Sequence, residues 1–461
     1  MTMSTTYPGV YIEEDASLSL SINTSPTAIP VFIGKFFKKN GSQPEKGSCI
    51  KITSWLDFIS QFSLSPVVSV AATPVKANAK QQNDQKQVEV SNEGAEVKNT
   101  YTYTATVTAT SLSAFAVQHY FNNGGGICYL LPLIETDSNA VTTELATLPD
   151  LIEKQQEITL LVCPETDATL VSCKKQDVYN AVNPLLQHKV DYFLIADSMN
   201  GTEKPTTQAD KTAVYYPNLV TAFTYSKPAD ADIVLRGYEG VSTLAALKIA
   251  SPDEYVKAEN EVNDKWKDAN VPTTPITLPP SAAIAGVYAA TDASRGVWKA
   301  PANIVLNGVS DVTERLTDDK QGTMNSSGIN AIRYFTNQGF VVWGARTLNK
   351  SDDWRYIPVR RLFNSAERDI KQAMQFAVFE PNSQPTWEAV RRAIDSYLYS
   401  LWQQGGLVGT KSSEAYFIQI GKGVTMTEDD INQGKMIVKI GMAAVRPAEF
   451  IILQFTQNVG Q

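Results

Sequence analysis

The sequence predicts a multi-domain protein of mixed α/β (α+β) class with extended β-arms at both chain ends. Its 461 residues exceed what one hydrophobic core normally serves. From residue 111 onward, helical patterns alternate with short, nearly continuous apolar runs, which is typical of a sheet covered by helices. Both ends instead show strand-like alternation without helical period.

The N-terminal arm is expected over residues 1–26. Pro8–Gly9 and Pro26 interrupt it, and residues 17–22 (SLSLSI) alternate strictly between serine and apolar side chains. A strand of this kind places Leu18, Leu20 and Ile22 on one face. A short apolar strand over residues 27–35 then enters the first globular part.

Two irregular zones interrupt the following region. Residues 76–86 are polar, whereas 101–108 (YTYTATVT) alternate and favour a strand, so 65–110 is interpreted as a surface insertion forming a loop or hairpin. Residues 226–280 contain an expected charged, exposed helix at 253–268 and a proline-rich linker.

Three helix–strand repeats define the outer α/β domain, assigned to residues 27–64 plus 111–280. The predicted helices cover 113–121, a segment ending near 156, and 176–189. The predicted strands cover 127–131, 158–162 and 191–196.

A C-terminal core domain is expected over residues 281–434. It combines predicted strands at 340–346 and 416–420 with two helices whose apolar residues recur at three- and four-residue steps. These positions are Ala366, Ile370, Met374 and Val378 in the first helix, and Trp387, Val390, Ile394, Leu398 and Leu401 in the second.

Residues 435–461 are predicted to form a C-terminal β-ribbon arm of two strands with no obvious partner nearby. Such a ribbon leaves backbone donors and acceptors open for pairing with another chain. The residues assigned to inter-subunit arms are Leu18, Leu20, Ile22, Val438, Ile440, Phe450, Ile452, Leu453 and Phe455.

The composition restricts the class of function. A net charge of −8 and a pI near 5.1 argue against nucleic acid as the main partner. No apolar run reaches the roughly 20 residues of a membrane-spanning helix. No signal peptide is visible, so we expect synthesis in the cytoplasm, and the four cysteines are interpreted as reduced core residues.

No motif predicts a catalytic, cofactor or metal site. His119 and His188 lack ligand partners in sequence, and Gly124–Gly126 follows a helix instead of preceding one, which favours a helix C-cap over a phosphate loop. Gly421–Lys422–Gly423 is interpreted as a turn. The acids at 428–430 follow Thr427, a good N-cap, and complement a helix dipole.

An arginine cluster is the remaining candidate. Arginine forks suit bidentate pairing with carboxylates, either between subunits or within the chain. The residues taken as candidate inter-subunit ion pairs are Arg346, Arg355, Arg360 and Arg361.

Several segments together resemble contractile tail sheath proteins, in the order in which that family carries them. They are residues 7–14 (YPGVYIEE), 295–303 (RGVWKAPAN), 342–348 (VWGARTL), 354–361 (WRYIPVRR) and 431–451. The chain is most similar to sheath proteins of extracellular contractile injection systems, of the Photorhabdus virulence cassette and antifeeding prophage type.

The resemblance implies a structural, non-enzymatic subunit that needs no cofactor. Such subunits stack as six-membered rings around an inner tube, and contraction drives the tube through a target membrane. The implied partners are neighbouring sheath subunits and paralogues, the tube protein, the baseplate and a terminal cap. Assembly would take place in the bacterial cytoplasm, and the product would be a released phage-tail-like particle without direct membrane insertion.

The family also implies that the two arms enter neighbours' sheets and that an inner-layer helix faces the tube. Residues 65–110 and 226–276 look like insertions relative to shorter sheath paralogues, and they would lie on the outer surface. The tube-facing candidates are Glu428, Asp429, Asp430 and Lys435, with the helix at 366–379 as the other choice. The tail sheath of a contractile bacteriophage remains an alternative. A type VI secretion sheath is disfavoured because it is assembled from two chains, and an α/β enzyme has only the helix–strand rhythm in its support.

Overall fold

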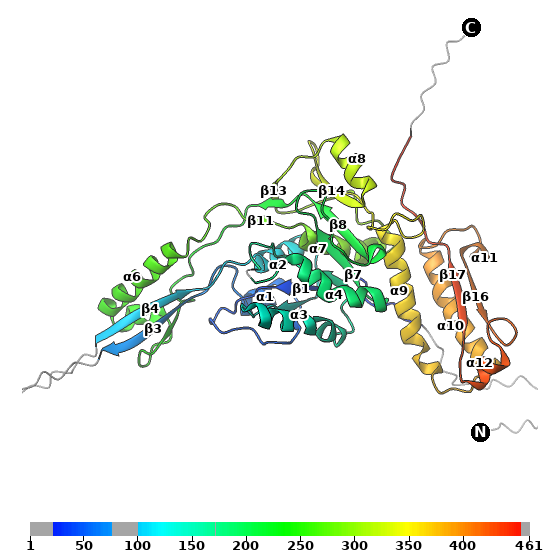
Figure 1. Ribbon diagram of the computed structural model, residues 1–461, viewed down its shortest axis with the longest axis horizontal. Coiled ribbons are helices and arrows are strands. Elements are labelled where there is room, and N and C mark those ends of the chain that lie inside the picture. The colour runs from blue at the N-terminus through cyan, green and yellow to red at the C-terminus, as the bar shows by residue number, and fades with distance from the viewer. Residues whose placement is uncertain (1–21, 76–99, 171, 453–461) are drawn as a thin grey trace, which may run out of the picture. The chain divides into compact units, whose positions relative to one another are not determined.

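The computed structural model describes residues 22–75, 100–170 and 172–452, and these divide into two compact units (Figure 1). One unit is Pro26–Arg361. The other joins residues 22–25 to the segment from Leu362 onward, where the Ser25 amide donates a hydrogen bond to Asp369 at 3.1 Å. The division falls inside helix α9 (Ile357–Ala373).

The Pro26–Arg361 unit is built on a nine-stranded sheet with the order β12-β15-β14-β8-β7-β6-β1-β5-β2. The six strands from β14 to β5 run parallel, and the outer ones pair antiparallel. The strands are β1 (Pro30–Gly34), β2 (Ile50–Ile52), β5 (Cys128–Pro132), β6 (Leu160–Val162), β7 (Phe193–Asp197), β8 (Thr212–Tyr216), β12 (Ile304–Val305), β14 (Ile329–Phe335) and β15 (Gly339–Trp343).

Helices cover both faces of this sheet, because alternate residues of the strands point to opposite sides. Phe32 of β1 belongs to the core under α1, α2 and α7, whereas Val31 and Ile33 belong to the core under α3 and α4. The helices are α1 (Trp55–Gln61), α2 (Ser113–Asn122), α3 (Ser138–Glu153), α4 (Lys175–His188) and α7 (Ser281–Arg295).

Local signals explain where these helices begin and end. Asp137 accepts hydrogen bonds from the amides of Asn139 and Ala140 and thereby caps the N-terminus of α3. Helix α2 ends before Gly124, whose φ of +89° favours glycine, and Gly125 N–H donates to the Tyr120 carbonyl. The glycine run is therefore a helix end, as predicted.

The predicted boundary at residue 280 is wrong. Strand β14 pairs in parallel with β8, with Ile329 opposite Val214, and β15 and β12 extend the same sheet. Helix α7 packs against α2. Residues 281–361 thus complete the first unit, because the edge of β8 would otherwise expose a row of unpaired backbone groups.

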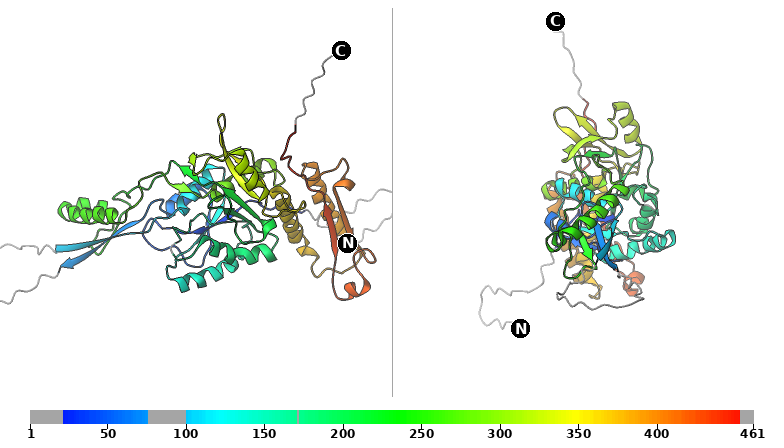
Figure 2. Two further views of the ribbon diagram at one scale, coloured as in Figure 1. Left: turned by 45° about the horizontal axis from the view of Figure 1, so that its top comes forward. Right: turned by 90° about the vertical axis from the view of Figure 1, so that its left-hand side faces the viewer.

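The two predicted insertions fold together as one subdomain with its own core. A three-stranded sheet of order β10-β3-β4 combines β3 (Val68–Val75) and β4 (Thr100–Val107) from the first with β10 (Val234–Arg236) from the second. Helices α5 (Leu244–Ala250) and α6 (Pro252–Asp268) complete it, and α6 runs alongside β4 (Figure 2). The predicted charged helix buries Tyr255, Ala258 and Val262 against this sheet.

Smaller elements fill the rest of this unit. A three-stranded sheet has the order β11-β9-β13, and α8 packs on β14. Their bounds are β9 (Leu219–Thr221), β11 (Thr277–Leu278), β13 (Val309–Val312), α8 (Asp318–Ser326) and the 3₁₀ turn η1 (Ala209–Lys211).

The second unit centres on α10 (Gln384–Gln403), which buries the five apolar residues predicted for it. The helix before it is shorter than predicted: α9 ends at Ala373, and Val378 is 57% exposed. The remaining elements are η2 (Met374–Ala377), α11 (Ser412–Ala415), β16 (Tyr416–Ile420), α12 (Glu428–Asn432) and β17 (Val438–Met442).

Candidate functional site

The most distinctive surface of the second unit is a sheet of only two strands. Strand β17 pairs antiparallel with β16, with Ile440 opposite Ile418 and Val438 opposite Ile420. The expectation that residues 435–445 have no partner nearby is therefore wrong, since an intervening turn and helix α12 bring β16 alongside. Within the described residues no third strand joins this sheet, so each strand keeps one outer edge.

One face of this sheet rests on α10. Strand β16 packs along the helix, Arg391 Nη2 donates to the Ile420 carbonyl at 2.7 Å, and Tyr416 donates to Asp395 at 2.9 Å. Asn382, just before α10, donates to the Lys435 carbonyl at 2.9 Å. These bonds hold both strands on a rigid support.

On the other face, an aromatic ring covers a glycine. A Cβ at Gly441 would lie 2.2 Å from Cε1 of Phe417, so the ring fills the space above the bare backbone. Phe417 remains 55% exposed. An isolated two-stranded sheet is marginal in water, so this one depends on α10 for its support. It is therefore an incomplete sheet with open edges.

The chain beyond this sheet is exposed. Within the described residues, Phe450, Ile451 and Ile452 form no strand and are 72%, 82% and 82% exposed. Ile22 is half-buried and not in a strand. Leu18, Leu20, Leu453 and Phe455 lie outside the described residues, so the cross-chain pairing of both arms stays a prediction.

The arginine cluster is largely engaged within the chain. Arg361, 3% exposed, pairs with Asp292 at 2.6 Å, and Arg360 is stacked on Trp354 at 4.1 Å and lies 3.9 Å from Asp210. Because Arg360 and Arg361 are buried beside acids of the same chain, the structure supports ion pairs within the chain for these two residues and not the predicted ion pairs between subunits. Arg355 pairs with Asp352, and Arg346 donates to the Asn325 carbonyl.

The predicted tube-facing acids lie on helix α12 and its cap. Thr427 caps the helix and exchanges hydrogen bonds with Asp430, whose pKa is lowered by the amide and hydroxyl of Thr427. Glu428 lies 3.2 Å from Lys422. Asp429 and Lys435 are exposed. The cap accounts for Asp430, and contact of this group with a tube stays a prediction.

A buried carboxylate that sequence reasoning missed fills the crevice where α/β sheets usually bind ligands. Strands β1 and β6 are neighbours, and the helices that come after them in the chain, α1 and α2 after β1 and α4 after β6, pack on opposite faces of the sheet. This arrangement makes the edge between β1 and β6 a topological switch point. Glu165, fully buried after β6, accepts hydrogen bonds there from the amides of Leu112 and Ser113 at 3.2 and 3.0 Å.

The Glu165 carboxylate thus occupies the N-terminus of α2, where a ligand phosphate would otherwise bind. The hydroxyls of Ser111 and Ser113 also donate to it. Nearby Lys35 donates to the Thr169 carbonyl, and burial lowers its pKa. Nothing in the local sequence distinguishes Glu165 as the partner of these serines.

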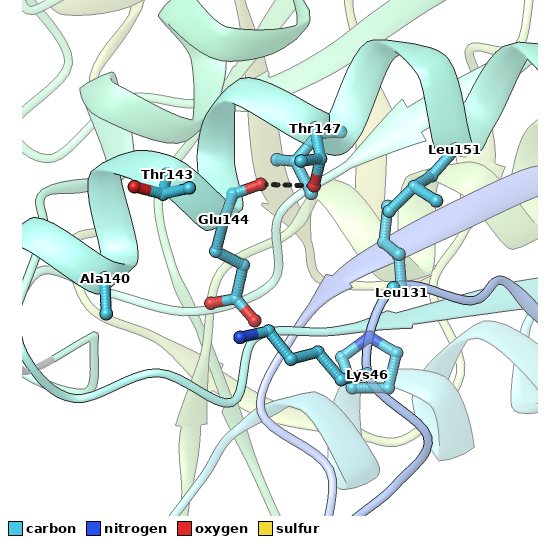
Figure 3. Close-up of a pocket in the computed structure, with 10 residues that line it drawn as sticks. Lys46, Leu131, Ala140, Thr143, Glu144, Thr147 and Leu151 are labelled. Atoms are coloured by element: carbon cyan, nitrogen blue, oxygen red, sulfur yellow. Dashed lines mark hydrogen bonds between the residues drawn. The ribbon is translucent and has the colours of Figure 1, made fainter.

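A pocket of about 380 Å³ lies beside β5 and α3. Lys46 and Glu144 point toward each other across it, and Leu131 and Leu151 form part of its wall (Figure 3). The Glu144 oxygens already accept hydrogen bonds from the amides of Ile134 and Glu135. Lys46 pairs with Glu135. The polar groups at this pocket therefore have structural partners.

The thiols and histidines show no reactive setting. All four cysteines are free, and burial raises the pKa of Cys49 to about 11 and of Cys163 to about 12. Burial lowers the pKa of His119 to about 4. Among the described residues no cluster of His, Cys, Asp and Glu could hold a metal, and none of their helices has the length and apolar character needed to cross a membrane.

The fold combines a helix-covered α/β sheet with a two-stranded sheet whose outer edges carry no further strand within the described residues. Two family models match the chain: the phage tail sheath protein central domain over residues 195–348 and the phage tail sheath C-terminal domain over 349–458. The chain belongs to the phage tail sheath family.

Two solved structures resemble it over nearly its full length. The contracted helical sheath of the anti-feeding prophage is 44% identical, with 99% of this chain and 100% of that chain covered and a TM-score of 0.69. The contracted PVC sheath of an extracellular contractile injection system is 39% identical, with 99% of both chains covered and a TM-score of 0.65. The chain is a contractile sheath protein.

Phage proteins match a shorter segment. The tail sheath protein of Vibrio phage KVP40 is 31% identical over 148 residues, and that of Enterobacteria phage T4 is 27% identical over 148 residues. These matches cover 31% of this chain but only 21% and 22% of the phage proteins.

Proposed function

We propose that this chain polymerises into a contractile sheath by completing the β16–β17 sheets of neighbouring copies with its own two arms. The observation that carries the proposal is an incomplete, open-edged sheet in a member of the sheath family. Residues 17–22 would add along one outer edge and residues 448–456 along the other, each on a different neighbour.

Strand addition suits a sleeve that changes shape. Main-chain hydrogen bonds give affinity, and alternate side chains give register. Each bond contributes only about 0.5–1.5 kcal/mol net. Two arms on every copy nevertheless give high avidity, because each later contact forms at high effective concentration. Subunits can then rotate while the strands remain paired, provided that the segments leading into them bend.

The finer assembly follows the family. We propose rings of six subunits stacked around an inner tube, a baseplate at one end, and assembly in the bacterial cytoplasm into a particle that is later released. The two solved sheaths are contracted, which supports contraction as the working stroke. A structural role requires no catalytic site, and Glu165 filling the switch-point crevice is consistent with that role.

Electron microscopy of the purified chain tests the strand-exchange proposal. The full chain should form striated tubes or rings, whereas chains lacking residues 1–22 or 448–461 should fold, as circular dichroism would show, and remain dispersed. Ile452→Asp should also prevent tubes, while Ile249→Asp, at an equally exposed isoleucine on α5, should not. Tubes of normal length from either truncation would contradict the proposal.

A second experiment concerns the tube-facing surface. Charge reversal at Asp429, which is exposed and takes no part in the Thr427–Asp430 cap, should reduce sheath occupancy on tubes while leaving tube-free polymerisation intact. Unchanged occupancy in micrographs would remove this surface from the proposal. Neighbouring genes for toxins rather than capsid proteins would favour an injection particle over a phage tail.

A further inference from the structure

A buried ion pair lies where the N-terminal arm enters the nine-stranded sheet. Arg361 on α9 makes a bidentate contact with Asp292 on α7, at 3.0 and 2.6 Å. The two side chains are 3% and 7% exposed. The guanidinium also lies 4.6 Å from the centre of the Tyr288 ring.

Both members of the ion pair form hydrogen bonds with Thr27, which directly follows the N-terminal arm. The Thr27 hydroxyl donates to Asp292, and the Thr27 carbonyl accepts from Arg361 Nη2 at 3.0 Å and from the Thr159 hydroxyl at 2.9 Å. The same Thr159 hydroxyl accepts from the Ile29 amide at 3.0 Å. Thr27 is thus held by α7, by α9 and by the segment entering β6, three residues before β1 begins.

Stability of the fold alone does not require this arrangement. A buried ion pair loses hydration on folding, and replacing it with well-packed apolar residues is often neutral or stabilising. What an apolar replacement could not provide is a set of directed hydrogen bonds to the backbone and hydroxyl of Thr27. A second buried ion pair, Lys175–Asp197 at 2.6 Å, has a different role. Asp197 accepts hydrogen bonds from the amide and hydroxyl of Ser281 and so caps the start of α7.

We propose that Thr27, Asp292 and Arg361, the arm clamp, transmit tension from the N-terminal arm into the sheet during contraction. The inference rests on the proposed linking role of the arm. When a neighbour pulls the arm, the load reaches the arm clamp before β1, so β1 stays paired with β5 and β6. Without the arm clamp, pulling would peel β1 from its N-terminal end.

The experiment compares Thr27→Val, which removes one hydroxyl with little change of shape, and Arg361→Met with the control Lys175→Met. The control removes a lysine from an ion pair of similar burial, 8% and 5% exposed, whose hydrogen bonds within the described residues involve none from 22–27. Amide hydrogen exchange over residues 27–33 in the full chain should accelerate at least tenfold in both clamp variants and remain unchanged in the control.

Assembled particles provide a measurement that tests load transmission itself, because a residue that only stabilises the fold would not change how often sheaths break on contraction. After contraction is triggered with mild denaturant, broken sheaths should be at least threefold more frequent in the clamp variants than in wild type or the control. Equal breakage would overturn the inference. If Arg361→Met does not fold, the comparison of Thr27→Val with the control is sufficient to test the inference.

The deletion of residues 1–22 separates the two ideas. If that deletion leaves tubes intact, the strand-exchange proposal fails and this inference fails with it. If the deletion abolishes tubes while the clamp variants contract without breakage, the arm clamp alone is refuted.

Discussion

Glu165 provides a sharp test of how the central sheet is stabilised. Its fully buried carboxylate accepts hydrogen bonds from the amides of Leu112 and Ser113 and from two hydroxyls. Hydrogen bonds to a charged group contribute about 1.5–3 kcal/mol each, and losing the acceptor also leaves buried donors unpaired. Glu165→Ala should therefore reduce the free energy of unfolding of the Pro26–Arg361 unit by about 3–5 kcal/mol. Glu165→Gln should cost about 2–3 kcal/mol, because its carbonyl still accepts but its amide meets donors.

Urea unfolding followed by circular dichroism measures this loss. Hydrogen exchange of the peptide around Ser113 assigns the affected transition to the correct unit. The matched control is Glu157→Gln, whose side chain is 47% exposed in an ion pair with Lys51 and should change stability by less than about 1 kcal/mol. A cost below about 1 kcal/mol for Glu165→Ala would refute the interpretation that this carboxylate secures the start of α2.

Three further predictions concern other parts of the chain. Burial lowers the pKa of His119 to about 4, so the unfolded chain binds a proton below pH 6.5 that the folded chain does not, and stability should fall by about 3 kcal/mol between pH 6.5 and 4; His119→Gln should remove this part of the pH dependence of the unfolding free energy, and an unchanged pH dependence would contradict burial of His119 as its cause. Deleting residues 66–109 should make 227–275 sensitive to protease, since both share one core, whereas deleting both segments should leave the remainder resistant; persistent resistance after the single deletion would count against co-folding. Gly441→Ala should displace Phe417 and lower hydrogen-exchange protection of β16 and β17, because its Cβ would lie 2.2 Å from the ring; full protection would count against that packing.

Local patterns predicted most of the regular structure. The apolar runs at 127–131, 158–162 and 191–196 correspond to β5, β6 and β7, and the three- and four-residue spacing from Trp387 to Leu401 corresponds to the buried face of α10. Each signal depends on residues close together in the chain. The class of fold followed from these patterns.

Pairings between distant segments could not be read in the same way. Nothing near residue 280 indicates that β14 pairs with β8, so the local patterns predict a domain boundary that falls inside one sheet. Strand β10 has only three residues, too few for a clear alternation, and its pairing with β3 joins two segments that are separated by 158 residues in the sequence, which local patterns cannot connect.

The candidate site shows the same limit. The C-terminal strands were recognised, but β16 was not recognised as the partner of β17 because α12 lies between them. Arg361 was singled out, yet its partner Asp292 is 69 residues away, so the internal pair could not be told from one between subunits. Glu165 was missed because an acid after an apolar strand has no distinctive local pattern.

A cryo-electron microscopy structure of the assembled sheath tests the central claim most directly. The account predicts that each β16–β17 sheet is extended on both outer edges, by residues 17–22 of one neighbouring copy and by residues 448–456 of another. If both ends of every copy instead pack on their own chain and the edges of β16 and β17 carry no strand from a neighbour, the account is contradicted.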